Sequence, residues 1–166
     1  MVLPKFARLL IPVLALTIVR TSMAQANVRT QIQANYDKIS RLSMMKDMIQ
    51  LAKVTRTNAA SNFEYLDALQ NSFDLDATVR QNAAQLERVS AFNFNSNTII
   101  ALKRLGRDLV CTLKTDYDLF LDPAKTRRVK GTCISEDTWI KTMKGWKIKR
   151  SKVVKETESQ NGKILK

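Results

Sequence analysis

The sequence predicts a small all-α protein: a helical bundle of four to five amphipathic helices, with one disulfide and a basic C-terminal segment. Two observations carry this prediction. Apolar residues recur at steps of three or four over most of the chain, which is the period of one helix face. No convincing hairpin pattern interrupts them. Amphipathic helices without a sheet bury their apolar faces against one another, which makes a bundle.

The first 26 residues are predicted to be a cleavable signal peptide. Lys5 and Arg8 precede an apolar run over residues 9–19, and Ala24 and Ala26 then place small residues where signal peptidase cuts. The run is too short for a spanning helix, which needs roughly 20 apolar residues, although an N-terminal membrane anchor is the alternative. Cleavage is expected after Ala26, so that residues 27–156 form the helical bundle domain.

The first half of that domain is predicted to hold three helices. An apolar stripe from Val28 to Ala52 predicts a helix over about 28–54, and a second helix follows up to about residue 72. A single kinked helix over 28–72 is the alternative. Asp74 is typical of an N-cap, which starts a third helix over about 75–91.

The second half is predicted to hold two more helices. Leucines and isoleucines from Ile99 onward predict a fourth helix, which ends at Asp122 because a residue before proline avoids helical backbone. Ser135 is a candidate N-cap for the last helix, which extends to about residue 154, although residues 146–149 alternate like a strand. Residues 157–166 are expected to form a disordered basic tail.

Cys111 and Cys133 are predicted to form a disulfide, because an isolated pair of cysteines usually bonds in an oxidising compartment. Closing the loop between them would stabilise the fold by about 3 kcal/mol. Two unbonded thiols are the alternative. No metal site is expected, since two cysteines without histidine make a poor zinc set.

The chain contains no histidine, which removes Ser-His-Asp and Cys-His catalysis and the commonest general base. The acidic pairs Asp74 with Asp76 and Asp116 with Asp118 have a spacing that points apart on a helix. No glycine-rich phosphate loop is present in the sequence. The sequence therefore predicts a protein that is not an enzyme and needs no cofactor.

Positive charge is concentrated at the C-terminal end. Residues 125–166 carry 13 basic and 4 acidic side chains, whereas residues 27–124 are nearly balanced. Seven cations of this region are predicted to bind a polyanion, such as a glycosaminoglycan, or an anionic membrane surface. They are Lys141, Lys144, Lys147, Lys149, Arg150, Lys152 and Lys155. A merely solvated face is the competing interpretation.

These features together favour a secreted, extracellular signalling or effector protein that binds a cell-surface or extracellular partner. The architecture looks like the general plan of helical cytokines: export, a helical bundle, one disulfide and a basic tail. A membrane-active or antimicrobial protein that uses residues 138–155 is the alternative function. A homodimer is possible, since the first helix is long.

Overall fold

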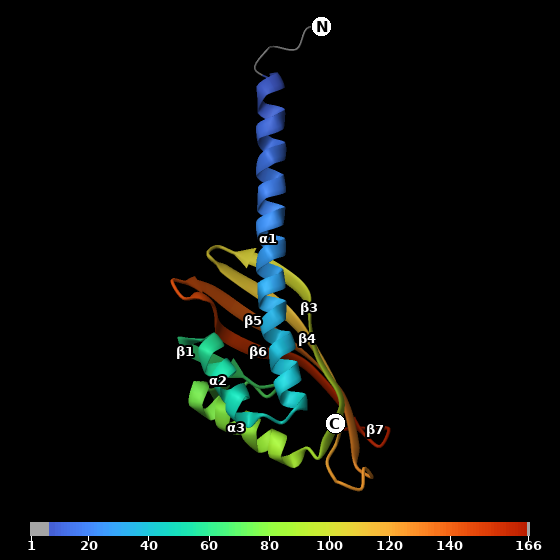
Figure 1. Ribbon diagram of the computed structural model, residues 1–166. Coiled ribbons are helices and arrows are strands. Elements are labelled where there is room, and N and C mark those ends of the chain that lie inside the picture. The colour runs from blue at the N-terminus through green and yellow to red at the C-terminus, as the bar shows by residue number, and fades with distance from the viewer. Residues whose placement is uncertain (1–6, 166) are drawn as a thin grey trace. The chain divides into compact units, whose positions relative to one another are not determined.

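The computed structural model describes residues 7–165, with the side chains of residues 26–164 (Figure 1). The chain divides into two compact units after Ile32. Its helices are α1 (Ala7–Met44), α2 (Met48–Asn58) and α3 (Leu75–Arg88). Its strands are β1 (Ala59–Leu66), β2 (Ser72–Phe73), β3 (Ala91–Leu105), β4 (Asp108–Phe120), β5 (Arg128–Thr142), β6 (Gly145–Gln160) and β7 (Lys163–Leu165).

The prediction of an all-α bundle is wrong, because the chain forms a seven-stranded sheet, with β1 and β2 before α3 and the other five strands after it. Part of the predicted second helix is therefore strand β1. The strand order is β2-β1-β6-β5-β4-β3, with β7 paired to β6. All pairs are antiparallel except β1 with β6, which run parallel. Figure 1 shows α2 and α3 side by side next to this sheet. The fourth and fifth predicted helices are therefore the hairpins β3–β4 and β5–β6.

The first unit contains the N-terminal part of α1. Thr30 Oγ1 donates to the carbonyl of Ala26 at 3.0 Å, one helical turn earlier. The predicted signal peptide, residues 1–26, falls almost wholly on residues whose side chains lie outside the described part of the chain. Among the helices that the structure describes, none combines the length and the apolar character needed to cross a membrane.

Two-residue turns make the antiparallel sheet possible. Asn161 and Gly162 join β6 to β7 with φ of 49° and 82°, the two positive values that a type I′ hairpin turn requires. Gly106, with φ of 62°, opens the turn between β3 and β4. Each turn reverses the chain within two residues, so the flanking residues pair as strands and cannot continue as helices.

The helices of the second unit start where acidic side chains cap them. Asp47 accepts a hydrogen bond from the backbone N–H of Gln50 at 3.0 Å, which starts α2. Asp74 does the same for Ala77 at 2.7 Å, so the prediction that Asp74 caps a helix is confirmed. A buried core then joins α1, α2 and α3 and consists of Leu42, Leu51, Val54 and Leu86.

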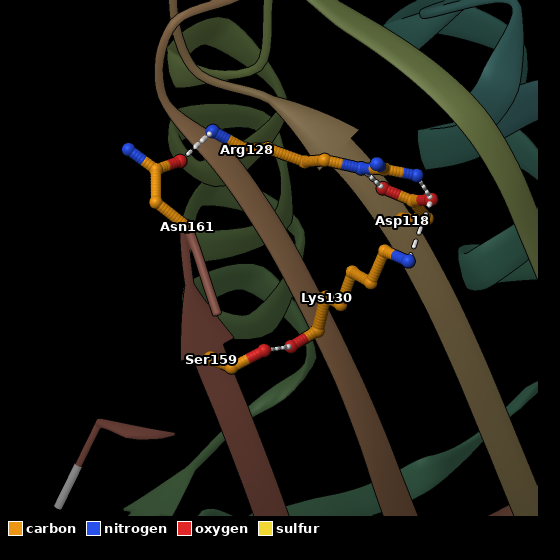
Figure 2. Close-up of polar contacts among 5 residues, drawn as sticks. All are labelled: Asp118, Arg128, Lys130, Ser159 and Asn161. Atoms are coloured by element: carbon orange, nitrogen blue, oxygen red, sulfur yellow. Dashed lines mark hydrogen bonds and ion pairs between the residues drawn. The ribbon is translucent and has the colours of Figure 1, made fainter. Parts of the chain in front are cut away.

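Within the segment predicted to be a disordered tail, residues 157–160 form the end of β6 and residues 163–165 form β7. Its turn is tied to the start of β5, because Asn161 Oδ1 accepts from the backbone N–H of Arg128 at 2.9 Å (Figure 2). The Arg128 guanidinium reaches across to β4 and binds both carboxylate oxygens of Asp118, at 2.8 and 2.5 Å. The side chain of Asp118 is only 4% exposed. These contacts hold three neighbouring strands together at one end of the sheet.

The outer edge of strand β3 is occupied at its middle by a side chain of α1. Gln33 Nε2 donates to the carbonyl of Asn97 at 2.6 Å, and Gln33 Oε1 accepts from the N–H of Ile99 at 2.9 Å. The side-chain amide of Gln33 therefore satisfies the same two backbone groups that a neighbouring strand would satisfy.

The predicted disulfide is absent. Cys111 lies opposite Asp137 in the β4–β5 ladder, whereas Cys133 lies opposite Thr115. The two cysteines are thus four residues out of register, which is about 13 Å along a strand and far beyond the reach of a disulfide.

Candidate functional site

A cavity of about 360 Å³ lies in the second unit between its helices and one face of the sheet. This volume is within the range of small-molecule sites, roughly 300–1,000 Å³. Much of the cavity wall is apolar. The apolar residues that line it are Ile39, Leu51, Ala59, Phe63, Leu86, Leu113, Ile148 and Val153.

The sheet supplies a polar floor to this cavity. Strand β5 contributes Cys133, Ser135 and Asp137, which alternate and so point to the same face of the sheet. Strand β6 contributes Ser151, which lies opposite Asp137 in the β5–β6 ladder. Polar side chains thus occupy positions of a central strand where apolar ones are usual.

Asp137 is the most unusual residue of the floor. It is 3% exposed, although it carries a carboxyl group. Ser151 Oγ donates to its Oδ1 at 2.6 Å, the hydroxyl of Tyr36 donates to its Oδ2, and the side chain of Ser135 is a third hydrogen-bond partner. Burial disfavours the charged carboxylate more than these hydrogen bonds favour it, so the pKa of Asp137 is raised.

Two aromatic residues support Asp137: Tyr36 on α1, which bonds to it directly, and Trp139 on β5, which bonds to Tyr36. Trp139 is fully buried, and its Nε1 donates to the Tyr36 hydroxyl oxygen at 3.1 Å. The two rings meet edge to face, with centroids 5.8 Å apart and an interplanar angle of 88°. Burial, and then the charge of Asp137, raise the pKa of Tyr36, which therefore keeps its proton. The result is a chain of hydrogen bonds from Trp139 through Tyr36 to Asp137.

The thiol of Cys133 lines the cavity beside this network. Burial, with a smaller effect of Glu156, raises its pKa to about 11. The protonated thiol is a poor nucleophile, so Asp137, whose pKa is raised by burial, is the acid–base group of the floor.

Neutral amides line the helix side of the cavity. Asn82 and Gln85 lie on α3 together with Thr78 at helical spacing, so the three share one face of that helix. Asn58, at the end of α2, also lines the cavity and is 8% exposed. In the described part of the chain, its Nδ2 is buried and has no hydrogen-bond partner. A buried donor left unpaired costs about 1–3 kcal/mol.

The described residues that line the cavity include no lysine or arginine, and Asp137 is their only carboxyl group. The whole chain carries 28 basic and 15 acidic residues, so the charge is placed elsewhere. The cavity is therefore nearly free of formal charge.

The seven cations predicted to bind a polyanion lie on β5, β6 and the turn between them, and not on the predicted helix. Three of them have local partners. Arg150 Nε lies 3.1 Å from Glu64 Oε2, Lys147 Nζ donates to the carbonyl of Thr57, and Lys141 Nζ lies 5.4 Å from the ring centre of Trp146. The other four are Lys144, Lys149, Lys152 and Lys155. None of the seven lines the cavity, and their binding to a polyanion stays a prediction.

Sequence reasoning missed the site residues because it placed them in other roles. Cys133 was expected to be half of a disulfide, Asp137 falls in the helix that Ser135 was expected to cap, and Tyr36 falls in the apolar stripe of the first predicted helix. A simple apolar–polar alternation does not reveal them, because Cys133, Ser135 and Asp137 hold the inward positions between the buried residues Val129 and Trp139.

Neither a protein-family model nor a curated protein matches the chain. Solved structures do match. A protein from Kribbella flavida is 12% identical with a TM-score of 0.64, covering 80% of this chain and 94% of its own. A protein from Novosphingobium aromaticivorans, provisionally assigned as a scytalone dehydratase, is 15% identical with a TM-score of 0.62, covering 84% and 90%. An NTF2-like superfamily protein from Salmonella enterica is 10% identical with a TM-score of 0.60, covering 78% and 91%.

At these identities, the comparisons bear on the fold only. They overturn the interpretation of the chain as a cytokine-like helical signalling protein, because the matching proteins include NTF2-like ones with a mixed architecture. The seven-stranded sheet with three helices is a mixed α/β arrangement of the NTF2-like fold.

Proposed function

We propose that this protein binds a small, mainly apolar organic molecule in the cavity, with Asp137 and Tyr36 as the polar anchor. The observation that carries the proposal is the buried carboxyl group of Asp137 in the floor of a cavity of about 360 Å³. Buried polar groups that only supported the fold would be expected to pack against protein on every side. An apolar cavity with a few convergent polar groups is instead the usual form of a ligand site.

A binding experiment with a blocked cavity tests this proposal. Ile148 lines the cavity and is half-buried, so Ile148→Trp fills the cavity with apolar atoms. Val154, on the same strand, is 54% exposed and does not line the cavity, so Val154→Trp is the matched control. The probes are naphthalene derivatives that carry one oxygen, and the measurement is isothermal titration calorimetry of each protein.

The wild-type chain and Val154→Trp are expected to bind a probe with similar affinity. Ile148→Trp is expected to bind it at least about tenfold more weakly. Circular dichroism checks that both variants keep the fold. Equal binding by all three proteins would show that the cavity is not the site. Absence of binding by the wild-type chain to any probe would contradict the proposal itself.

Acid–base catalysis in the same cavity is a second candidate function. The raised pKa of Asp137 favours it, since a carboxyl group that titrates nearer neutrality can both give and take a proton. The assignment of the Novosphingobium aromaticivorans protein as a dehydratase points the same way. Asp137→Asn keeps the size of the side chain but cannot transfer a proton. If catalysis occurs, this variant binds substrate and shows no turnover.

A further inference from the structure

We infer that the cavity selects an uncharged ligand with a hydrogen-bond-acceptor oxygen, and that Asn58 binds this oxygen; the inference rests on the proposed function. Two separate observations carry it. One is the near absence of formal charge around the cavity, and the other is the unpaired amide nitrogen of Asn58.

The charge of the cavity decides which ligands it excludes. An anionic group bound in an apolar cavity needs a cationic partner to replace its water, and the described lining residues include no lysine or arginine. Asp137 adds a second obstacle, because any ionised fraction of its carboxyl group repels an anion. A carboxylate or phosphate ligand would therefore lose its hydration without gaining an ion pair.

The amides decide which group the ligand presents on the helix side. Asn58 is 8% exposed and lines the cavity, and its Nδ2 has no partner in the described part of the chain. An acceptor oxygen on a bound molecule, reached by a small rotation of the side chain, would supply the missing partner. Asn82 and Gln85 on α3 line the same cavity and are further neutral donors.

The matched probes are 2-acetylnaphthalene, 2-naphthoate and 2-isopropylnaphthalene. They share one ring system and nearly one shape, and they carry a neutral acceptor oxygen, an anionic carboxylate and no oxygen, respectively. Their dissociation constants are measured at pH 7.5 by isothermal titration calorimetry with the wild-type chain. 2-Acetylnaphthalene is expected to bind about a hundredfold more tightly than 2-naphthoate, because the anion is desolvated without a partner.

The role of Asn58 is tested by Asn58→Leu, which keeps the volume and removes the donor. The variant is expected to bind 2-acetylnaphthalene about fivefold to tenfold more weakly and 2-isopropylnaphthalene no more weakly. Asn62→Leu, at an exposed position of β1, is the control and leaves both affinities unchanged. If Asn58 only supported the fold, its replacement would shift the melting temperature and leave the ratio of the two affinities as it is.

The outcomes separate this inference from the proposed function. Tight binding of 2-naphthoate, blocked by Ile148→Trp, would overturn the selection of an uncharged ligand while the cavity remained a binding site. An unchanged affinity ratio in Asn58→Leu would overturn the role of Asn58. No binding of any of the three probes to the wild-type chain would overturn the proposed function, and this inference with it.

Discussion

At Gly131 on β5, a single neighbouring side chain decides whether one added carbon stabilises or destabilises the protein. A Cβ built on Gly131 would lie 2.3 Å from both Cζ and Oη of Tyr117, well inside the roughly 3.5–4.0 Å of a normal carbon–carbon contact. Tyr117 lies directly opposite Gly131 in the β4–β5 ladder, and its hydroxyl donates to Glu158 on β6. The ring therefore lies across the glycine, and Gly131→Ala must displace it.

The size of the effect follows from what the displaced ring loses and what alanine gains. A hydrogen bond to a charged group contributes about 1.5–3 kcal/mol, reduced here because Tyr117 and Glu158 are only partly buried. Gly131 does not have a positive φ, so alanine is compatible with its backbone and gains about 0.5–1 kcal/mol by lowering the entropy of the unfolded chain. Gly131→Ala is therefore expected to destabilise the protein by about 1 kcal/mol.

The effect of Gly131→Ala on stability reverses its sign when the ring of Tyr117 is removed. In a Tyr117→Thr background, Gly131→Ala is expected to stabilise the protein by about 0.5–1 kcal/mol. Urea unfolding followed by circular dichroism measures all four proteins, with an unchanged m-value as the check that the unfolded states are comparable. The same destabilisation by Gly131→Ala in both backgrounds would show that Tyr117 does not cover the glycine, and would refute this reasoning.

Two buried carboxyl groups give opposite pH dependences. Burial raises the pKa of Asp137, so its contribution to stability is full below the unfolded pKa of about 3.9 and is lost as the pH rises through the folded pKa, by at most about 1.4 kcal/mol per pH unit. Asp137→Asn should therefore gain stability relative to the wild-type chain between pH 4.5 and 7.5, and a constant difference in urea unfolding would contradict this. The hydrogen bonds from Arg128 lower the pKa of Asp118, so its contribution is present above the unfolded pKa and is lost as the pH falls through the folded pKa. Asp118→Asn should be less stable than the wild-type chain at pH 7 and equal to it in acid, and a deficit that persists in acid would count against the ion pair.

The helical parts of α1 and α3 were largely predictable from sequence, because helical signals are local. The predicted second helix up to about residue 72 was wrong, because residues 59–66 and 72–73 form β1 and β2. The stripe through Tyr36 and Leu42 and the cap at Asp74 depend on residues within a turn or two. The structure ends α1 at Met44 and starts α2 at Met48, where Asp47 caps the new helix. The predicted continuous helix over 28–54 therefore breaks at a cap residue that the apolar periodicity passes over.

The second half was not predictable by periodicity, because its strands do not alternate simply between apolar and polar residues. On β4, Leu109, Cys111 and Leu113 are buried at every second position. Leu109 and Leu113, together with Leu105 at the end of β3, also have the spacing of a helix face. On β5 the inward positions hold Cys133, Ser135 and Asp137, since they face the cavity. Because these inward positions are polar, β5 lacks the alternation of apolar and polar residues that would have predicted a strand.

A short signal for the hairpins was nevertheless present. Asn161-Gly162 is the dipeptide most typical of a two-residue hairpin turn, and it lies in the segment that was interpreted as a disordered tail. Pairing between distant strands, such as β1 with β6, has no local signal of this kind. The site depends on that long-range pairing, because it brings Asn58 and Ala59 to the cavity beside Ile148.

The side-chain amide of Gln33 has a consequence for how the protein behaves in a crowded solution. β3 is the last strand of the described sheet and is 15 residues long, and long open strands attract strands of other molecules. By bonding to Asn97 and Ile99, Gln33 removes the central docking points for an incoming chain. One glutamine on a helix thereby helps this sheet to end within its own molecule and resist growth into fibrils.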